Sequence, residues 1–172
     1  MTVTVPRLET ARLALRAFEP SDVEPYVQMM ADPDVCRFLG DGRALDRADA
    51  WRQLAMLIGH WELRGFGLWA VEERESGRFI GRIGCHEPEG WPGFEIGYVL
   101  AREVWGRGLA HEGAAAALAY ARRELGRVSI ISLIRPANRA SIRVAERLGA
   151  RRTDSVEFYG ATTDVYTYPL SG

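Results

Sequence analysis

The sequence predicts a mixed α/β or α+β fold, in which helices cover a mostly antiparallel central sheet. Three short apolar segments follow one another within residues 67–100, separated by glycines, which is typical of an antiparallel meander. Two helical segments then flank a nearly continuous apolar strand between residues 111 and 150. A last pair of strands, turning at Tyr159 and Gly160, completes the sheet.

The first strand is expected within residues 8–18. Apolar and polar residues alternate loosely there, which places Leu13, Leu15 and Ala17 on one face. A broken helical stretch is expected at residues 32–39, before the long helix described below.

A helix is predicted over residues 21–30. Ser21 and Glu24 have the spacing of a capping box, which would satisfy free amides at the start of this helix. Pro25 falls in the first turn, where proline is tolerated because its missing N–H has no helical partner.

A longer helix is predicted over residues 46–65, where Gly65 ends the pattern. Its apolar side chains recur at helical spacing, so we expect them to share one face: Trp51, Leu54, Leu57, Ile58 and Trp61.

The remaining elements follow the same two periodicities. The three meander strands are short and rich in β-branched and aromatic residues, at residues 67–73, 77–87 and 93–100. A helix over residues 111–126 stops at Gly126, and the apolar strand after it covers residues 127–134. A second helix, residues 138–150, closes at Gly149, and the final hairpin covers residues 151–170.

The composition excludes several kinds of chemistry. All 22 basic residues are arginine, so neither a lysine Schiff base nor a phosphate-binding loop that needs lysine can form. A net charge of -1 argues against a general nucleic-acid binder, which usually has a basic excess. Cys36 and Cys85 form neither a disulfide framework nor a Cys-x-x-Cys metal site.

No signal-peptide pattern and no apolar run of the ~18 residues needed to span a bilayer occurs in the sequence. We therefore expect a cytoplasmic protein that contacts neither membrane nor nucleic acid and needs no metal.

The most informative segment is the glycine-rich turn after the third meander strand. Gly106, Gly108 and Ala110 keep the start of the next helix free of large side chains, so a ligand can approach the backbone closely. Backbone N–H groups at a helix start form a site for phosphate or pyrophosphate, and Arg107 adds a positive charge. The dinucleotide pattern G-x-G-x-x-G fails because His111 occupies its last position. A glycine-rich helix start without any ligand is the alternative.

The second motif is Asn138-Arg-Ala-Ser141, between the apolar strand and the last helix. Asn138 is the only asparagine of the chain. Either Asn138 or Ser141 could cap the helix, and the Asn138 amide could equally bind an amide-containing ligand arm, because it offers both a donor and an acceptor. The residues alone leave these roles open.

Together the two motifs resemble the GNAT superfamily of acyl-CoA-dependent N-acyltransferases. The family's turn is R/Q-x-x-G-x-G/A, and here Trp105 stands before Gly106-Arg107-Gly108-Leu109-Ala110. This departure, the opening LETARLALRAFEPSD, the strand FEIGYVL and the segment ANRASIRVAERLGA resemble the RimJ/RimL branch of ribosomal-protein N-terminal acetyltransferases. The resemblance runs from about Leu8 to Leu170, so one domain is expected over residues 8–170.

The resemblance implies a binding mode for acetyl-CoA. The strand ending Tyr98-Val99-Leu100 and the strand of residues 127–134 splay apart, and the pantetheine arm lies between them, paired with the backbone of the first strand. The amides of the turn hold the pyrophosphate, and Asn138 binds the pantetheine. The residues of the turn are Gly106, Arg107, Gly108, Leu109, Ala110 and His111.

The implied reaction is direct attack of a neutral amine on the thioester, so a base, an oxyanion site and an acid for the thiolate are needed. Glu95 occupies the position of the base, and its alternative is a structural or solvated glutamate. Ser141 matches the serine near the sulfur and is the candidate acid, whereas the tyrosine acid of many members is replaced by Ala145. A backbone N–H near Val99 or Leu100 is the implied oxyanion donor.

Other polar and aromatic side chains have weaker claims. His86 is a second choice for the base, His111 belongs to the start of the helix, and His60 fits ordinary packing or surface. Cys85 lies in an apolar strand, which disfavours a covalent cysteine mechanism. Four aromatic residues could line the acceptor pocket or pack in the core: Trp69, Trp91, Phe94 and Tyr159.

The expected activity is transfer of an acetyl group from acetyl-CoA to a primary amine in a ternary complex. Alternatives are a larger acyl donor such as succinyl-CoA, a CoA-binding module without catalysis, and an interaction protein without a ligand. The acceptor could be a protein N-terminus or a small molecule, since no motif in residues 21–64 or in the last hairpin identifies it. A homodimer through the C-terminal strands is a further expectation.

Overall fold

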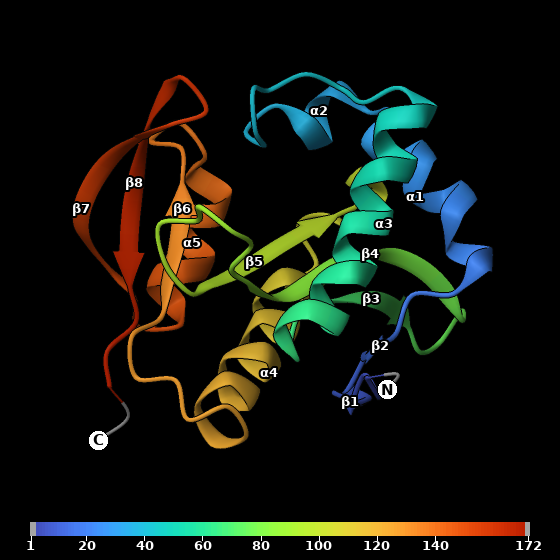
Figure 1. Cartoon of the computed structure of the whole chain (residues 1–172), viewed down its shortest axis with the longest axis horizontal. Helices are drawn as coiled ribbons and strands as arrows, with labels where there is room; N and C mark the ends of the chain where they lie inside the picture. The colour runs from blue at the N-terminus through green and yellow to red at the C-terminus, as the bar shows by residue number, and fades with distance from the viewer. Residues whose placement is uncertain (1–2, 171–172) are drawn as a thin grey trace.

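The computed structural model describes residues 3–170 and contains one sheet with helices on both faces (Figure 1). The strands are β1 (Leu8–Glu9), β2 (Leu13–Arg16), β3 (Leu68–Glu73), β4 (Arg78–His86), β5 (Glu95–Leu100), β6 (Ile131–Ile134), β7 (Arg151–Phe158) and β8 (Ala161–Thr167). Their order in the sheet is β1-β2-β3-β4-β5-β6-β8-β7, and only the β5–β6 pair is parallel. The mixed, mostly antiparallel sheet is therefore confirmed, and so are the meander and the final hairpin.

The helices are α1 (Val23–Met30), α2 (Pro33–Cys36), α3 (Arg47–Arg64), α4 (Leu109–Arg123) and α5 (Arg139–Arg147), with short 3-10 turns at Pro20–Asp22 and Arg102–Val104. Helix α4 packs on β4 and β5, whereas α1 packs against β4 and α3 on the other face. None of the helices in residues 3–170 is long and apolar enough to span a membrane.

Two hydrophobic clusters occupy the two faces of the sheet. Ile83 and Cys85 of β4 lie in the cluster that includes Ala114 and Ala117 of α4. Val99 of β5 lies in the opposite cluster, with residues of α1 and α3. Because side chains alternate between faces along a strand, these assignments fix the face of every residue in the regular part of β4 and β5.

Two expectations for the N-terminal third are wrong in detail. Residues 8–18 form two short paired strands, β1 and β2, and β2 is buried along its whole length. The capping box joins Glu19 and Asp22, two residues before the expected Ser21–Glu24 pair, because a 3-10 turn precedes α1. Pro25 does lie in the first turn of α1.

In α3 the predicted apolar face is only partly buried. Leu54, Leu57 and Trp61 face the core, but Trp51 and Ile58 are 57% and 47% exposed. Gly65 ends this helix in the left-handed conformation, with φ 75°, as its position after the last helical residue predicts.

The C-terminal elements match the predicted order, with shorter bounds. Helix α4 ends at Arg123, before Gly126, and β6 begins only at Ile131, after a segment without regular secondary structure. The hairpin turns at Tyr159 and Gly160, whose φ angles of 49° and 71° fit the two-residue turn that such hairpins favour.

Candidate active site

The central feature of the site is the separation of β5 from β6. Their pairing holds at Glu95 and Ile131, where the Ile131 N–H donates to the Phe94 carbonyl at 2.9 Å. Beyond this pair, a side chain and not the backbone links the two strands: Ser132 Oγ donates to the Ile96 carbonyl at 2.6 Å. The two strands therefore diverge toward their C-terminal ends and leave one edge of β5 without a partner strand.

The free edge of β5 can be assigned by alternation. The Ile96 carbonyl faces β6, so the backbone groups of Tyr98 and Leu100 face the same side, and those of Val99 face β4. The Leu100 carbonyl accepts a bond from Trp105 Nε1 at 2.8 Å. The amides of Tyr98 and Leu100 are therefore the ones that can bind a ligand lying in the gap.

The glycine-rich turn follows directly at the end of β5. Gly106 and Gly108 have φ angles of 74° and 77°, which glycine adopts without strain, and Gly108 is the N-cap of α4. A β-carbon on Gly106 would meet no described atom within 4 Å, so the space above this backbone is open. The first amides of α4, including those of Leu109, Ala110 and His111, lack partners within the helix.

The charged side chains around this turn are tied to one another. Arg107 Nη2 donates to Glu73 Oε1 at 2.5 Å, so part of its charge is already neutralised. Arg12 donates from Nη1 to the Arg107 carbonyl at 2.8 Å and pairs with Glu112 at 2.7 Å. Arg12 is thus a second cation at the turn, which the sequence motif did not indicate because it comes from β1–β2.

Asn138 is the N-cap of α5, since its Oδ1 accepts from the Ser141 N–H at 3.2 Å. The capping role therefore belongs to Asn138 and not to Ser141. Because capping uses only the amide oxygen, the Nδ2 group can still donate to a ligand. Tyr98 reaches the same helix, where its hydroxyl donates to the Ser141 carbonyl at 2.9 Å. The structure thus brings Tyr98, Asn138 and Ser141 together beside the gap.

Glu95 lies buried where the two strands begin to diverge. Its Oε1 accepts from the Leu133 N–H at 3.1 Å, and its Oε2 accepts from Trp91 Nε1 at 2.7 Å. Burial raises the pKa of Glu95 to about 7, although these two bonds and the charge of Arg82 act in the opposite direction. A carboxyl group with such a pKa can accept a proton near neutral pH.

His86 pairs with Glu95 across β4 and β5 and is 7% exposed. Its ring stacks on His60 of α3 with 5.3 Å between centroids and meets Trp91 edge-on at 4.7 Å. Burial and the charge of Arg82 together lower the pKa of His86 to about 3, so His86 is a poor proton acceptor at neutral pH. His60 is a packing residue, with Nδ1 at 2.7 Å from the Phe66 carbonyl.

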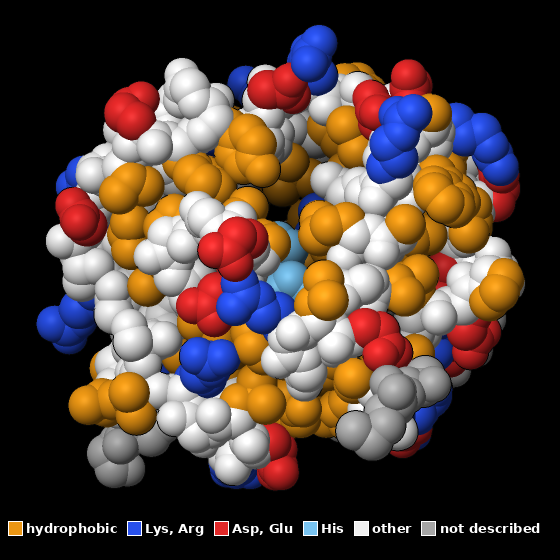
Figure 2. Space-filling model, in the orientation of Figure 1, with side chains coloured by type: hydrophobic (Ala, Val, Ile, Leu, Met, Phe, Trp, Pro, Cys, Tyr) orange, Lys and Arg blue, Asp and Glu red, His pale blue; other side chains and the backbone are white. Residues whose placement is uncertain are grey.

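A row of side chains faces α1 and α3 from β4 and β5. The register pairs His86 with Glu95, Gly84 with Gly97, and Arg82 with Val99. The glycine pair separates the two polar positions, and a β-carbon on Gly97 would meet only Leu68 Cδ2, at 3.8 Å. We call His86, Glu95, Gly97 and Arg82 the acceptor row. Figure 2 shows a hollow near the centre of this face of the molecule, with histidine atoms at its floor.

The four aromatic residues divide into two pairs. Trp69 and Phe94 are core residues, 0% and 4% exposed. Trp91 and Tyr159 lie at the site, where Phe158 links them: its ring is 4.8 Å from Trp91 and 4.7 Å from Tyr159. The tip of the β7–β8 hairpin is therefore joined to the Glu95 side chain through Trp91.

Cys85 points to the opposite face of β4 and is fully buried, which raises the pKa of its thiol to about 12. The thiol is therefore neutral at physiological pH and is not a nucleophile, as its apolar strand predicts.

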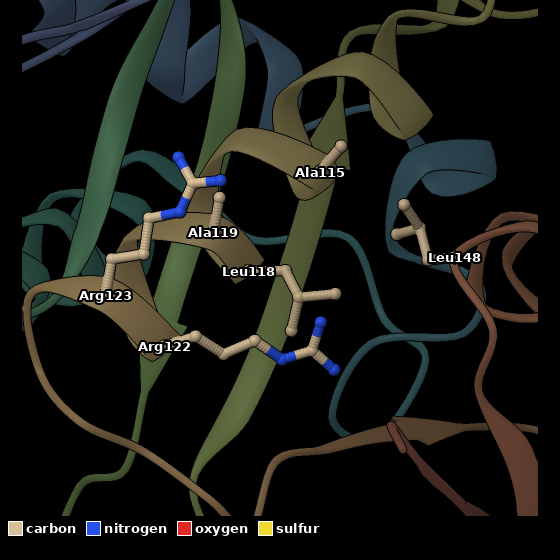
Figure 3. Close-up of a pocket in the computed structure, with 6 residues that line it drawn as sticks. All are labelled: Ala115, Leu118, Ala119, Arg122, Arg123 and Leu148. Carbon is tan, nitrogen blue, oxygen red and sulfur yellow. The ribbon is translucent and has the colours of Figure 1, made fainter. Parts of the chain in front are cut away.

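A separate open groove of the described surface lies away from these residues. It has a volume of about 440 Å³ and is formed along α4 and the end of α5 (Figure 3). Leu118, Arg122 and Arg123 project from α4, with Leu148 across from them. None of these residues belongs to the gap, the turn or the acceptor row.

Sequence reasoning found Glu95, the turn and the Asn138 motif but missed Arg82, Gly97 and Arg12. An arginine within an otherwise apolar strand was a signal for Arg82. The positions of Gly97 and Arg12 depend on strand register and on long-range pairing, which leave no local pattern.

Comparisons with known proteins agree with this geometry. The acetyltransferase (GNAT) domain matches residues 12–151. The protein YkkB of Bacillus subtilis is 33% identical over 168 residues, which cover 93% of this chain and 94% of YkkB. An acetyltransferase structure from Agrobacterium tumefaciens has a TM-score of 0.86 at 31% identity, covering 96% of this chain and 95% of that one.

The predicted RimJ/RimL branch is not established by these comparisons. RimL, the ribosomal L7/L12 α-N-protein acetyltransferase solved with coenzyme A, has a TM-score of 0.79, and the alignment covers 96% of this chain and 98% of RimL. Its identity is only 17%, so the likeness extends to the fold alone. YkkB is nearly twice as similar in sequence.

Proposed function

Since the chain belongs to the GNAT acetyltransferase family, we propose that it transfers an acetyl group from acetyl-CoA to a primary amine, by direct attack in a ternary complex. The observation that carries this proposal is the Glu95 carboxyl, buried where β5 and β6 diverge, with a pKa of about 7. The acceptor is an amine on a protein N-terminus or on a small molecule, and the proposed location is the cytoplasm.

Acetyl-CoA would lie in the gap between β5 and β6. The amides of Gly106 to His111 would hold its pyrophosphate, with Arg12 and Arg107 as flanking cations. The pantetheine amides would pair with the backbone of Tyr98 and Leu100, and Asn138 Nδ2 would donate to the same arm. This arrangement supports the proposal because each of these groups borders the gap or the turn.

Glu95 would then act as the base, receiving the proton of the attacking amine directly or through water. The Leu100 N–H faces the gap and would stabilise the oxyanion. The Val99 N–H faces β4, so we do not assign it this role. Ser141 would protonate the departing thiolate. Because a thiolate is a good leaving group, the contribution of Ser141 should be smaller than that of Glu95.

A mass-spectrometric screen of peptides and small amines with acetyl-CoA tests the proposal. We expect an acetylated amine with the wild-type protein and at least 100-fold slower transfer with Glu95→Gln, the lower end of the range of about 10²–10⁴ for a lost general base. Glu75→Gln, in an exposed turn, is the matched control. Binding of CoA without transfer to any amine would favour a non-catalytic CoA-binding module instead.

The same screen run with succinyl-CoA tests the alternative donor. A larger anionic acyl group should need an extra cation beside the thioester. If transfer from succinyl-CoA is faster than transfer from acetyl-CoA, succinyl-CoA becomes the assigned donor.

A further inference from the structure

Arg82 is a cation in the acceptor row without a carboxylate partner. It shares the face of β4 that turns toward α1 and α3, because it pairs with Val99 of the cluster on that face. Its charge acts on Tyr26 and Cys36 on the helix side and on His86 and Glu95 at the other end of the row. The side chain of Arg82 therefore lies on the face of the sheet that is covered by α1 and α3.

Three buried side-chain nitrogen atoms on the sheet and after β6 lack a hydrogen-bond partner within the described residues. Arg82 Nε, His86 Nδ1 and Arg135 Nη1 are buried without a hydrogen-bond partner among residues 3–170. Arg135 follows β6 and donates from Nη2 to the Gly40 carbonyl at 2.6 Å, so it crosses from the sheet to the loop after α2. Buried donors of this kind are normally satisfied, and an unmet group indicates a missing ligand or water.

Arg16 shows how this chain treats a buried arginine that has only a structural role. It pairs with Asp22 at 2.8 Å and with Glu72 at 2.7 Å. By contrast, neither Arg82 nor Arg135 has a carboxylate within 4.0 Å in the described part of the chain. Because a partly buried cation without an anionic partner is unfavourable, an anion brought to Arg82 would gain a favourable ion pair.

We propose that the acceptor amine carries a carboxylate, which Arg82 binds while the amine lies next to Glu95. This inference rests on the proposed N-acetyltransferase function and adds the class of its substrate: a small amino acid or a similar short amino carboxylate. A planar carboxylate matches the guanidinium fork, which can form two parallel hydrogen bonds with it.

The spacing of the acceptor row limits the size of this substrate. Glu95 and Val99, the residue opposite Arg82, are four residues apart on β5, or ~13 Å between α-carbons at ~3.3 Å per residue. The charge of Arg82 acts on the Glu95 carboxyl and lowers its pKa, and Gly97 leaves the middle of the row open. A molecule with its amine and carboxylate separated by a few bonds therefore spans the two groups.

Matched pairs of amines test the inference. Free amino acids of increasing length between amine and carboxylate are compared with their carboxamides, with alkylamines of equal length, and with phosphorylated amines. We expect kcat/KM for the best carboxylate to exceed that of its carboxamide by about 10- to 100-fold, the usual range for a hydrogen bond to a charged group.

The variant Arg82→Gln should bring this ratio close to one. The KM for acetyl-CoA should stay within about threefold of wild type, because Arg82 lies outside the glycine-rich turn, and the change should appear in the ratio of carboxylate to carboxamide. Arg82→Lys should keep part of the preference because it keeps the charge. Arg123→Gln, on the far side of α4, is the control and should leave the ratio unchanged.

Several results would overturn the inference: equal rates for carboxylates and carboxamides in the wild type, a preference for phosphorylated amines, or a ratio that survives Arg82→Gln. If Arg82→Gln does not fold, carboxylic acids without an amine decide the question in the wild type. They should inhibit competitively against the amine and not against acetyl-CoA, and inhibition by the matching carboxamides at equal concentration would contradict the proposal.

The failure of the proposed function gives a different result. In that case no amine is acetylated. Calorimetry with the CoA-bound protein then tests the carboxylate site separately from the acetyltransferase activity. Tighter binding of carboxylates than of carboxamides supports the carboxylate site, and equal binding rejects it.

Discussion

The two ends of the candidate site are built in different ways. At the turn, the charged side chains are already paired, as in Arg12–Glu112 and Arg107–Glu73, and the free groups are backbone amides. In the acceptor row the free groups are side chains, and two of them, Arg82 and His86, have buried nitrogen atoms without partners. The proposed cofactor end is thus organised before binding, whereas the proposed acceptor end has buried nitrogen atoms that a ligand or water must satisfy.

This difference matches the demands of the two ligands. A pyrophosphate needs many N–H donors in fixed positions, which a glycine-rich helix start provides with almost any side chains nearby. An acceptor is selected by side chains, and these can change without altering the fold. Substitutions in the acceptor row should therefore change the reaction of the amine, and substitutions at the turn should change acetyl-CoA binding.

The largest effect should come from Glu95→Gln. Removing the base should lower kcat by about 10²–10⁴-fold and leave the affinity for acetyl-CoA within twofold. Steady-state kinetics and calorimetric titration with CoA check the two parts. A variant that loses CoA affinity as much as rate would show that Glu95 serves the cofactor end.

Gly97→Ala should place a methyl group in the hollow at little cost to the fold, because its β-carbon would contact only Leu68. We expect kcat/KM for the amine to fall by about 10- to 100-fold through misplacement of the acceptor. Thermal unfolding and the KM for acetyl-CoA should stay near wild type.

Gly84→Ala provides the contrast on the opposite strand. Its β-carbon would lie 2.5 Å from the Gly67 carbonyl oxygen at a φ of 155°, so this variant should lose stability before it loses specificity. Equal loss of stability in both glycine variants would contradict the open position of Gly97.

Gly108→Ala tests the other end. Its φ of 77° costs an alanine about 1–2 kcal/mol, so binding of acetyl-CoA should weaken by about 5- to 30-fold if the turn must keep this conformation. At saturating acetyl-CoA the rate should be unchanged. A reduced kcat with normal acetyl-CoA affinity would show that the turn affects the reaction step and not only acetyl-CoA binding, and would contradict the contrast with the acceptor row.

The smallest effect is expected for Cys85→Ala. The thiol is buried against α4 with a pKa of about 12, so kcat should stay within about twofold of wild type and stability should fall slightly. Mass spectrometry of the protein with acetyl-CoA alone should show no acetyl group on Cys85. An acetylated Cys85 that transfers its acetyl group to the amine would show a covalent mechanism and contradict direct attack.

The sequence predicted the parts of this molecule that depend on local pattern. Gly65, Gly106 and the Tyr159–Gly160 turn have positive φ angles and lie at the helix end and turns that the sequence predicted. The register of β4 against β5 could not be predicted, because it is fixed by the two clusters on opposite faces and by a bulge between β3 and β4. Since that register joins Glu95 to Gly97 and Arg82, the acceptor end became visible only in the structure.

The partial misassignment of α3 has a similar origin. Trp51 and Ile58 follow helical spacing, but the sheet covers only one side of this helix, and both remain exposed. Likewise, the capping box moved to Glu19 and Asp22 because Arg16 binds Asp22 from β2, a contact between elements that local spacing does not contain.

The pH dependence of amine acetylation tests the central claim most directly. A base must be ionised to accept a proton, so kcat/KM for the amine at saturating acetyl-CoA should fall as pH decreases through about 7, the pKa of Glu95. In Glu95→Gln this acidic limb should disappear, and only the limb set by the amine itself should remain. The same limb near pH 7 in both proteins, with an undiminished rate in the variant, would contradict the assignment of Glu95 as the base.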